Sequence, residues 1–202
     1  MKWLAVILGL SLCWLMVVVW RAARIAPRLV EGETAPDFQL RDPNGRIHTL
    51  VAYRGRWLVL YFYPRDATPG CTREACDFRD NFLKVQALDA DIVGISVDRS
   101  ETHARFARQH RLPFPLLADP AGKTAAAYGA LFRLGPLRFA RRHTFILTPE
   151  GCVGKIFRQV HPGQHAAEVG AALAAMQRQR TSPEHVPACG LRHQKPGESV
   201  VG

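Results

Sequence analysis

The sequence predicts an α/β domain in which helices pack against a mixed β-sheet, and three features lead to that prediction. Residues 57–63 (WLVLYFY) and 91–98 (DIVGISVD) are mainly apolar runs of a length typical of buried strands. Segments with helical spacing alternate with these runs, which favours a sheet whose strands are joined by helices. Later in the chain, HTFILT and CVGKIFRQV flank the turn PEG and indicate an antiparallel hairpin, so the sheet should be mixed.

The other elements follow in chain order. From Cys71 to about Leu88, apolar residues recur at helical spacing on one broad face. A second helix runs from a cap at Ser100 to about His110. Residues 114–119 (FPLLAD) predict a short strand and residues 122–130 (GKTAAAYGA) a short helix. HAAEVGAALAAMQRQR at 165–180 predicts a closing amphipathic helix, and no internal repeat is visible.

The first 29 residues predict a membrane anchor. Residues 3–20 (WLAVILGLSLCWLMVVVW) carry no charge and approach the roughly 20 residues that a membrane-spanning helix needs. Trp3 and Trp20 stand at the two ends, where interfacial aromatic residues are favoured. A signal peptide would have a shorter apolar core and small residues at its cleavage site. An uncleaved anchor is therefore favoured over a removed signal and over a buried core helix.

The side of the membrane on which the domain lies is less well determined. Lys2 and the terminal amine precede the apolar run, and Arg21, Arg24 and Arg28 follow it. The more positive flank of a membrane-spanning helix usually stays on the cytoplasmic side. The C-terminal flank has one more positive charge than the N-terminal flank, which weakly favours a cytoplasmic domain on a single-pass plasma-membrane (inner-membrane) anchor. The side itself is left open.

These boundaries divide the chain into the anchor with its basic flank (1–29), one folded domain (30–180) and a C-terminal tail (181–202). The tail contains Pro183, Pro187 and Pro196 with several glycines, and is predicted to be disordered.

Composition excludes several classes of function. The chain has 202 residues and a net charge of +10, but its basic residues are scattered, with only short clusters such as RRH at 141–143. No aromatic-interleaved basic stripe appears, which argues against a nucleic-acid partner. The histidines His103, His110 and His143 are interpreted as surface or packing residues, and no ligand set spaces like a zinc site.

The cysteines do not have the pattern of a disulfide scaffold, because their number is odd and their spacing irregular. They are Cys13, Cys71, Cys76, Cys152 and Cys189. Cys152 follows the turn of the predicted hairpin and is interpreted as a packing residue, while nothing supports a role for Cys189.

Cys71 is the strongest candidate for chemistry. It follows a predicted buried strand and opens a predicted helix, where free N–H groups and the positive helix end favour the reactive thiolate. Pro69 fixes the backbone at the helix start, and Gly70 lets the backbone approach a small substrate closely. Thr68 offers a hydroxyl that can donate to the thiolate or accept from a substrate. Together these three residues are expected to form a rigid pocket around Cys71 that contains hydrogen-bond donors.

These residues also resemble a known family. Pro64-x-x-x-Thr68-x-x-Cys71 matches the active-site signature of the peroxiredoxins, and FYPRDATPGCTREACDFRD is similar to the bacterioferritin-comigratory (Q-type) branch. The likeness extends from about residue 31 to 180 and includes GETAPDFQLRDPNG, YRGRWLVLYFYP and RHTFILTPEG. It implies a thioredoxin-like fold, thiol-dependent reduction of hydrogen peroxide and organic hydroperoxides, and no metal or organic cofactor.

The resemblance also implies roles for particular residues. Cys71 would be the peroxidatic cysteine, Pro64 and Thr68 would shape its pocket, and Arg142 would stabilise the thiolate and the polarised peroxide. Cys76 matches the resolving cysteine, whose thiol condenses with the Cys71 sulfenic acid to form a disulfide. Thioredoxin or a similar dithiol protein would then restore both thiols, and the protein would act as a monomer.

Helix geometry adds a condition to this assignment. Residues five apart in an intact α-helix have Cα atoms about 8 to 9 Å apart, whereas a disulfide rarely tolerates more than about 7 Å. The first turn of the helix that carries Cys71 and Cys76 is therefore expected to unwind before the bond closes.

Several alternatives stay open at this stage. Cys76 could be a passive helix residue while Cys152, Cys189 or an external thiol resolves the sulfenic acid. A membrane-tethered thiol–disulfide oxidoreductase would usually have Cys-x-x-Cys, but four residues separate Cys71 from Cys76. A tethered copper-delivery protein would need a tighter cysteine pair and a histidine. A fourth interpretation makes the domain a non-catalytic, membrane-bound interaction module.

Overall fold

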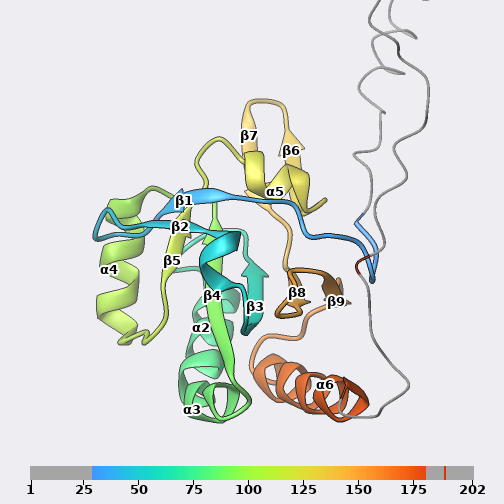
Figure 1. Cartoon of the computed structure of the whole chain (residues 1–202). Coiled ribbons are helices and arrows are strands. Elements are labelled where there is room, and N and C mark those ends of the chain that lie inside the picture. Colours follow the sequence, from blue (N-terminus) through green and yellow to red (C-terminus); the bar gives the residue numbers. More distant parts are fainter. Residues whose placement is uncertain (1–28, 181–188, 190–202) are drawn as a thin grey trace, which may run out of the picture.

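The computed structural model describes residues 29–180 and Cys189, and it confirms the α/β prediction with a mixed sheet (Figure 1). A seven-stranded sheet has the order β2-β1-β5-β4-β3-β8-β9, and a separate pair of strands forms a small hairpin. The strands are β1 (Gln39–Arg41), β2 (Ile47–Thr49), β3 (Trp57–Phe62), β4 (Ala90–Ser96), β5 (Leu116–Ala118), β6 (Leu131–Leu134), β7 (Leu137–Ala140), β8 (His143–Leu147) and β9 (Val153–Phe157). The helices are η1 (Leu50–Tyr53), α2 (Pro69–Asp80), α3 (Phe82–Gln86), α4 (Ser100–His110), α5 (Lys123–Ala127) and α6 (His165–Arg180).

The centre of the sheet is β3, whose apolar sequence WLVLYF is buried along its whole length. It runs parallel to β4 and antiparallel to β8, which in turn pairs with β9 in the predicted hairpin. Side chains alternate between the two faces of a strand. Leu58, Leu60 and Phe62 accordingly enter one core cluster, and Trp57, Val59 and Tyr61 enter the other.

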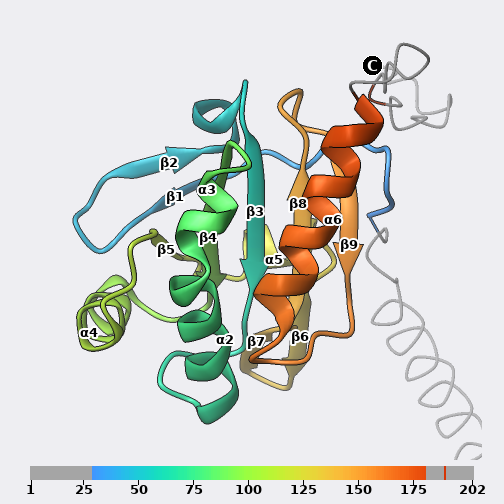
Figure 2. The same cartoon turned by 90° about the horizontal axis from the view of Figure 1, so that it is seen from below.

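Helices cover both faces of the sheet, which explains why β3 is apolar on both sides. Figure 2 shows α2, α3 and α6 over the same face, and their residues Phe78, Val85 and Val169 belong to one core cluster. On the other face, Ala125 of α5 and the adjacent Tyr128 belong to the second cluster.

The predicted helix from Cys71 to Leu88 is two helices, because α2 ends at Asp80 and α3 begins at Phe82. The side-chain amide of Asn81 donates to the carbonyl oxygen of Asp77 at 2.9 Å, and such a local bond competes with a continuous helix. The prediction that Ser100 caps the next helix was also wrong. Ser100 is the first helical residue, and Arg99 takes the extended backbone of the cap position.

The short strand and short helix predicted over residues 114–130 are present as β5 and α5. The hairpins β1–β2 and β6–β7 were not predicted, because their strands have only three or four residues each. The predicted anchor lies outside the described residues, except for Leu29, and so does the predicted tail, except for Cys189. Over the described part of the chain, no helix is long and apolar enough to span a membrane.

The interpretation of Cys152 as a packing residue was wrong. Cys152 is buried beside the β8–β9 turn and forms a disulfide with Cys189, with the two Cα atoms 5.5 Å apart. The sequence gives no spacing signal for this bond, since 37 positions separate the two cysteines. The disulfide fastens one point of the C-terminal segment to the edge of the sheet.

Candidate active site

Cys71 lies in the first turn of α2, directly after the loop that follows β3. Thr68 takes an extended backbone at the cap position and Pro69 begins the helix, so the local sequence sets the turn that was expected. The Cys71 side chain is buried and its thiol is free. Its sulfur therefore lies at the positive end of α2, where negative charge is stabilised.

Arg142 approaches this sulfur from another part of the chain. Its Nη2 atom donates to Cys71 Sγ at 3.2 Å. Arg142 immediately precedes β8, and the antiparallel register pairs His143 at the start of β8 with Phe62 at the end of β3. The chain leaving β3 and the chain entering β8 consequently meet at one end of the sheet. The neighbouring Arg141 turns away, with its guanidinium 5.8 Å from the centre of the Phe132 ring.

Glu74 completes this ion-pair network and was missed in the sequence. It lies three residues after Cys71, on the same side of α2, and its buried carboxylate accepts a hydrogen bond from Arg142 Nη1. Burial raises the pKa of Glu74 to about 7, although the Arg142 charge opposes the rise. Burial alone would lower the pKa of Arg142, but the charges of Glu74 and Cys71 raise it, so Arg142 keeps its positive charge.

Gly70 makes room for the Arg142 guanidinium. A Cβ atom at this position would lie 3.2 Å from Arg142 Nη2, a tighter contact than real side chains usually make. The sequence pointed instead to close approach of a substrate. Gly70 therefore also leaves room for Arg142, because a residue with a Cβ atom would require the guanidinium to shift beside Cys71.

The structure places Thr68 and Pro64 in the same loop as Cys71. Thr68 Oγ1 donates to the carbonyl oxygen of Arg65 at 3.1 Å, so its recorded bond holds the loop and does not reach the Cys71 sulfur. Pro64 is half-buried at the point where the loop leaves β3. Ala67, between them, has a positive φ of 56°, which is uncommon for a residue other than glycine.

A buried polar cluster supports this loop from behind. Asp66 accepts a hydrogen bond from the Tyr63 hydroxyl at 2.8 Å, and its other carboxylate oxygen lies 2.8 Å from His103 Nδ1. The Asp66 backbone N–H donates to Asp98 at 2.8 Å. His103 is therefore a fully buried residue that holds the active-site loop, which the sequence pattern did not reveal.

Cys76 lies on the same unbroken helix as Cys71, and its thiol is also free. Its sulfur is half-buried, 3.9 Å from Nδ1 of His110 at the end of α4. Arg79 fixes this end of α4 by donating to the His110 carbonyl oxygen at 2.9 Å. The sequence treated His110 as a surface or packing residue, and only the fold brings it to Cys76.

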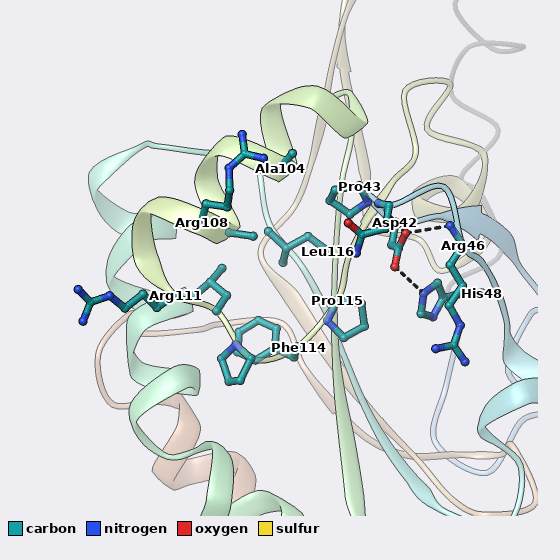
Figure 3. A pocket seen from close by; sticks show the side chains of 14 residues that line it. Asp42, Pro43, Arg46, His48, Ala104, Arg108, Arg111, Phe114, Pro115 and Leu116 are labelled. Carbon is teal, nitrogen blue, oxygen red and sulfur yellow. Dashed lines mark hydrogen bonds and ion pairs between the residues drawn. The ribbon is translucent and has the colours of Figure 1, made fainter.

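A cavity of about 570 Å³ lies elsewhere, between the β1–β2 hairpin and the α4–β5 segment (Figure 3). Its lining contains the buried pair His48 and Asp42, 3.3 Å apart, but no cysteine, and Arg111 points away from it in Figure 3. Among residues 29–180 and Cys189, no group of three or more His, Cys, Asp or Glu residues is placed to hold a metal ion.

Comparisons with known proteins identify the family of the chain. The model of the AhpC/TSA family matches residues 31–156. The chain is 42% identical over 151 residues to peroxiredoxin Bcp of Bacillus subtilis, covering 72% of this chain and 95% of that protein. It is 40% identical over 152 residues to the chloroplastic peroxiredoxin Q of Sedum lineare, covering 73% of this chain and 80% of that protein.

Solved structures show the same relationship. Peroxidoxin BcpB from Mycobacterium tuberculosis has a TM-score of 0.70 and 34% identity, covering 74% of this chain and 99% of that one. The bacterioferritin comigratory protein of Xanthomonas campestris has a TM-score of 0.65 and 35% identity, covering 69% of this chain and 91% of that one. The predicted thioredoxin-like fold is confirmed. The chain belongs to the AhpC/TSA family and is a peroxiredoxin of its Bcp/PrxQ branch, a thiol peroxidase that reduces peroxides.

Proposed function

We propose that this peroxidase works with two cysteines, Cys71 as the peroxidatic thiol and Cys76 as the resolving thiol. The observation that carries the proposal is the hydrogen bond from Arg142 Nη2 to Cys71 Sγ at 3.2 Å, at the N-terminal end of α2. A permanent cation and a helix end act on one sulfur, which is the environment of a reactive thiolate. The substrates are hydrogen peroxide and organic hydroperoxides, and the Xanthomonas campestris relative is described as reducing alkyl peroxides.

In the first step the Cys71 thiolate attacks one oxygen of the peroxide. The S–O bond forms as the O–O bond breaks, the sulfur is oxidised to a sulfenic acid, and the other oxygen leaves as hydroxide or alkoxide. The proton that Cys71 lost returns to this leaving group and gives water or an alcohol. Arg142 stabilises the negative charge that moves from sulfur to oxygen, because its guanidinium lies beside the reacting atoms.

In the second step the Cys76 thiol attacks the sulfenic sulfur, forms a disulfide and releases water. Both sulfurs belong to one intact helix, so the helix must open before they meet. The unwinding of α2 is expected to stop at Asp77. The carboxylate of Asp77 accepts a hydrogen bond from the Ala166 backbone N–H at 2.8 Å, which holds α2 against α6. The segment from Pro69 to Cys76 therefore unwinds, while the helix from Asp77 onwards keeps its contact with α6.

In the third step a thioredoxin-like dithiol protein reduces the disulfide. One of its thiolates attacks the Cys71–Cys76 bond, and its second thiol then closes a disulfide on the reductant, so that two electrons return to the enzyme. The resemblance to the Q-type branch supports a monomer as the working unit. The single cysteine at the helix start and its guanidinium partner favour this cycle over a tethered thiol–disulfide oxidoreductase.

The apolar run at residues 3–20 supports a single-pass anchor in the plasma membrane. Two observations bear on which side of the membrane the domain occupies. The flanking charges favour the cytoplasm by a margin of one, whereas the Cys152–Cys189 disulfide favours an oxidising compartment. The thiol state of Cys189 in the cell decides between the two compartments.

The proposal is tested by counting thiols in the full chain after one equivalent of hydrogen peroxide. Wild-type protein should lose two thiols, Cys71→Ser should lose none, and Cys76→Ser should give a sulfenic acid that a dione reagent traps. Cys13→Ser serves as the matched control and should behave as wild type. A disulfide that still forms in Cys76→Ser would assign the resolving role to another thiol.

Hydrogen exchange tests the helix opening in the same samples. Amides of residues 72–80 should exchange faster in the disulfide form than in the dithiol form, because each donates to the carbonyl four residues earlier, within the segment that opens. The amides of Asn81 and Val85, which donate to the carbonyls of Asp77 and Asn81, should not change. Equal exchange of residues 72–80 in the two forms would contradict the opening, and faster exchange of Asn81 would contradict the boundary at Asp77.

A further inference from the structure

The small hairpin of β6 and β7 stands apart from the main sheet. Its strands pair only with each other, and Figure 1 shows them projecting from the body beyond α5. Every residue from Phe132 to Arg138 is exposed. Gly135, with a φ of 56°, makes the tight turn between the strands. Within the described part of the chain, the Arg141 guanidinium lies 5.8 Å from the centre of the Phe132 ring, and the segment is nevertheless exposed along its length.

One face of the hairpin is entirely apolar. The register pairs Phe132 with Phe139 and Leu134 with Leu137, and residues directly opposite each other in an antiparallel pair share a face. We call these four residues the apolar hairpin face. Phe132, Leu134 and Leu137 are 43%, 63% and 53% exposed, which is unusual for large apolar side chains gathered at one place.

The opposite face of the hairpin carries two arginines. Arg133 and Arg138 lie directly opposite each other, and like charges in that position destabilise a strand pair. No carboxylate within residues 29–180 forms an ion pair with either of them. An anion bound between the two guanidinium groups would remove the repulsion.

The hairpin also borders the active site. The guanidinium of Arg65, in the loop before Cys71, lies 5.8 Å from the centre of the Phe139 ring. The last residue of β7, Ala140, is followed within two positions by Arg142. Figure 2 shows β6 and β7 at the end of the molecule where α2 and α6 begin. A surface that binds the hairpin is thereby brought to the loop that carries the peroxidatic cysteine.

We propose that the β6–β7 hairpin docks on an anionic phospholipid bilayer. Leu134 and Leu137 at the tip enter the boundary between headgroups and acyl chains, and Arg133 and Arg138 bind the phosphate groups around them. The net charge of +10 adds long-range attraction to such a surface. A second copy of the chain would cover the apolar face but leave both arginines without an anion, so charge complementarity favours the lipid.

Docking has a consequence that rests on the proposed function. Hydroperoxides carried by the lipids themselves would meet Cys71 without first leaving the membrane. The hairpin thus defines a substrate class, phospholipid hydroperoxides, in addition to small peroxides in water.

Hydrogen exchange of the full chain in lipid nanodiscs tests the docking. Amides of residues 131–140 should exchange at least about tenfold more slowly in discs containing phosphatidylglycerol than in discs of phosphatidylcholine alone. The amides of β3 should be equal in both and serve as the reference for an intact fold. Equal exchange of the hairpin in the two kinds of disc overturns the proposal, as does protection that rises with protein concentration in the absence of lipid.

Four variants separate charge, apolar contact and general effects. Arg133→Gln with Arg138→Gln should abolish the difference between the discs, while Arg133→Lys with Arg138→Lys should keep it. Leu134→Ser with Leu137→Ser should also abolish it, and Leu83→Ser, at a leucine of α3 that is 75% exposed, is the matched control that should keep it. If the glutamine variant still exchanged more slowly in phosphatidylglycerol discs than in phosphatidylcholine discs, the proposed role of the arginine charges would be wrong.

Turnover of hydrogen peroxide in the same discs keeps the two proposals distinct. Equal hairpin exchange in an enzyme that consumes peroxide overturns only the docking. Slow hairpin exchange in a protein whose Cys76→Ser variant still forms a disulfide after peroxide overturns only the two-cysteine cycle.

Discussion

Arg142 donates a hydrogen bond from Nη2 to the Sγ atom of Cys71 at 3.2 Å, although 71 positions separate the two residues in the sequence. The contact exists because β8 runs antiparallel to β3, so the chain enters one strand where it leaves the other. The sheet register therefore places the Arg142 guanidinium beside the Cys71 thiol. A shift of one residue in this pairing would turn the Arg142 side chain to the other side.

Removal of the Arg142 charge should slow the oxidation of Cys71. We expect Arg142→Met to lower the second-order rate constant for hydrogen peroxide by about 100-fold, the effect of losing one donor to a transition-state charge. Arg142→Lys should recover part of the rate, since it restores the charge without the two-pronged geometry that contacts both Cys71 and Glu74. Stopped-flow measurement of the first step gives this constant.

Arg141→Met is the matched control for this experiment, because the adjacent Arg141 faces Phe132 and has no contact with the thiol. The peroxide rate of this variant should equal that of the wild type. If both methionine variants lose the same fraction of the rate, the effect comes from general basic charge and the specific contact is not the cause.

Glu74 predicts a dependence of stability on pH. Burial raises its pKa from 4.5 to about 7 in the folded chain, so the folded state binds the proton more tightly than the unfolded state. The contribution is fully present below about pH 4.5 and is lost as the pH rises to about 7. The difference between these two values corresponds to about 3 kcal/mol of unfolding free energy.

Denaturant unfolding of wild type and Glu74→Gln at several pH values measures this contribution. The stability of the wild type relative to the variant should fall between about pH 4.5 and 7. Glu101→Gln, at an exposed glutamate of α4, should leave the profile unchanged. A parallel pair of curves for wild type and Glu74→Gln would show that the carboxylate does not titrate in this window.

The sequence was sufficient for the parts of the fold and site that depend on local pattern. The apolar runs of β3 and β4 identified the central strands, and the prolines and glycine before Cys71 identified a helix start beside a reactive thiol. Glu74 was within reach of the same reasoning, because it lies one turn after Cys71, but a charged residue on a helix is usually exposed. Its burial becomes evident only when Arg142 is in place.

Contacts between distant segments could not be read from spacing. His110 reaches Cys76 only because α4 packs near α2, and His103 reaches Asp66 only because α4 lies behind the active-site loop. The β6–β7 strands escaped prediction for a different reason. Four-residue strands that pair only with each other carry too short an alternation to distinguish them from a loop.

His110 should speed the second step of the cycle, because Nδ1 lies 3.9 Å from Cys76 Sγ and can accept the thiol proton before Cys76 attacks. We expect His110→Phe to slow disulfide formation about 100-fold without changing the oxidation of Cys71. Phenylalanine keeps an aromatic ring against Phe106, whose ring centre is 4.9 Å from that of His110. Gln109→Ala, at the exposed neighbouring position, is the control. The lifetime of the sulfenic acid after one equivalent of peroxide is the measurement, and an unchanged lifetime in His110→Phe would remove His110 from the mechanism.

The Cys152–Cys189 disulfide should stabilise the domain and report on its compartment. Closing a loop across 37 positions removes entropy from the unfolded chain that corresponds to about 4 kcal/mol. Cys189→Ser should lower the unfolding free energy of oxidised protein by up to about this amount, and Cys13→Ser should not lower it. A thiol reagent that adds a mass tag can be applied to cells at lysis. If the domain lies in an oxidising compartment, Cys152 and Cys189 should stay untagged, because their thiols are held in the disulfide. Tagging of both cysteines in the wild type would place the domain in the cytoplasm, in agreement with the flanking charges, and would show that the bond does not form in the cell.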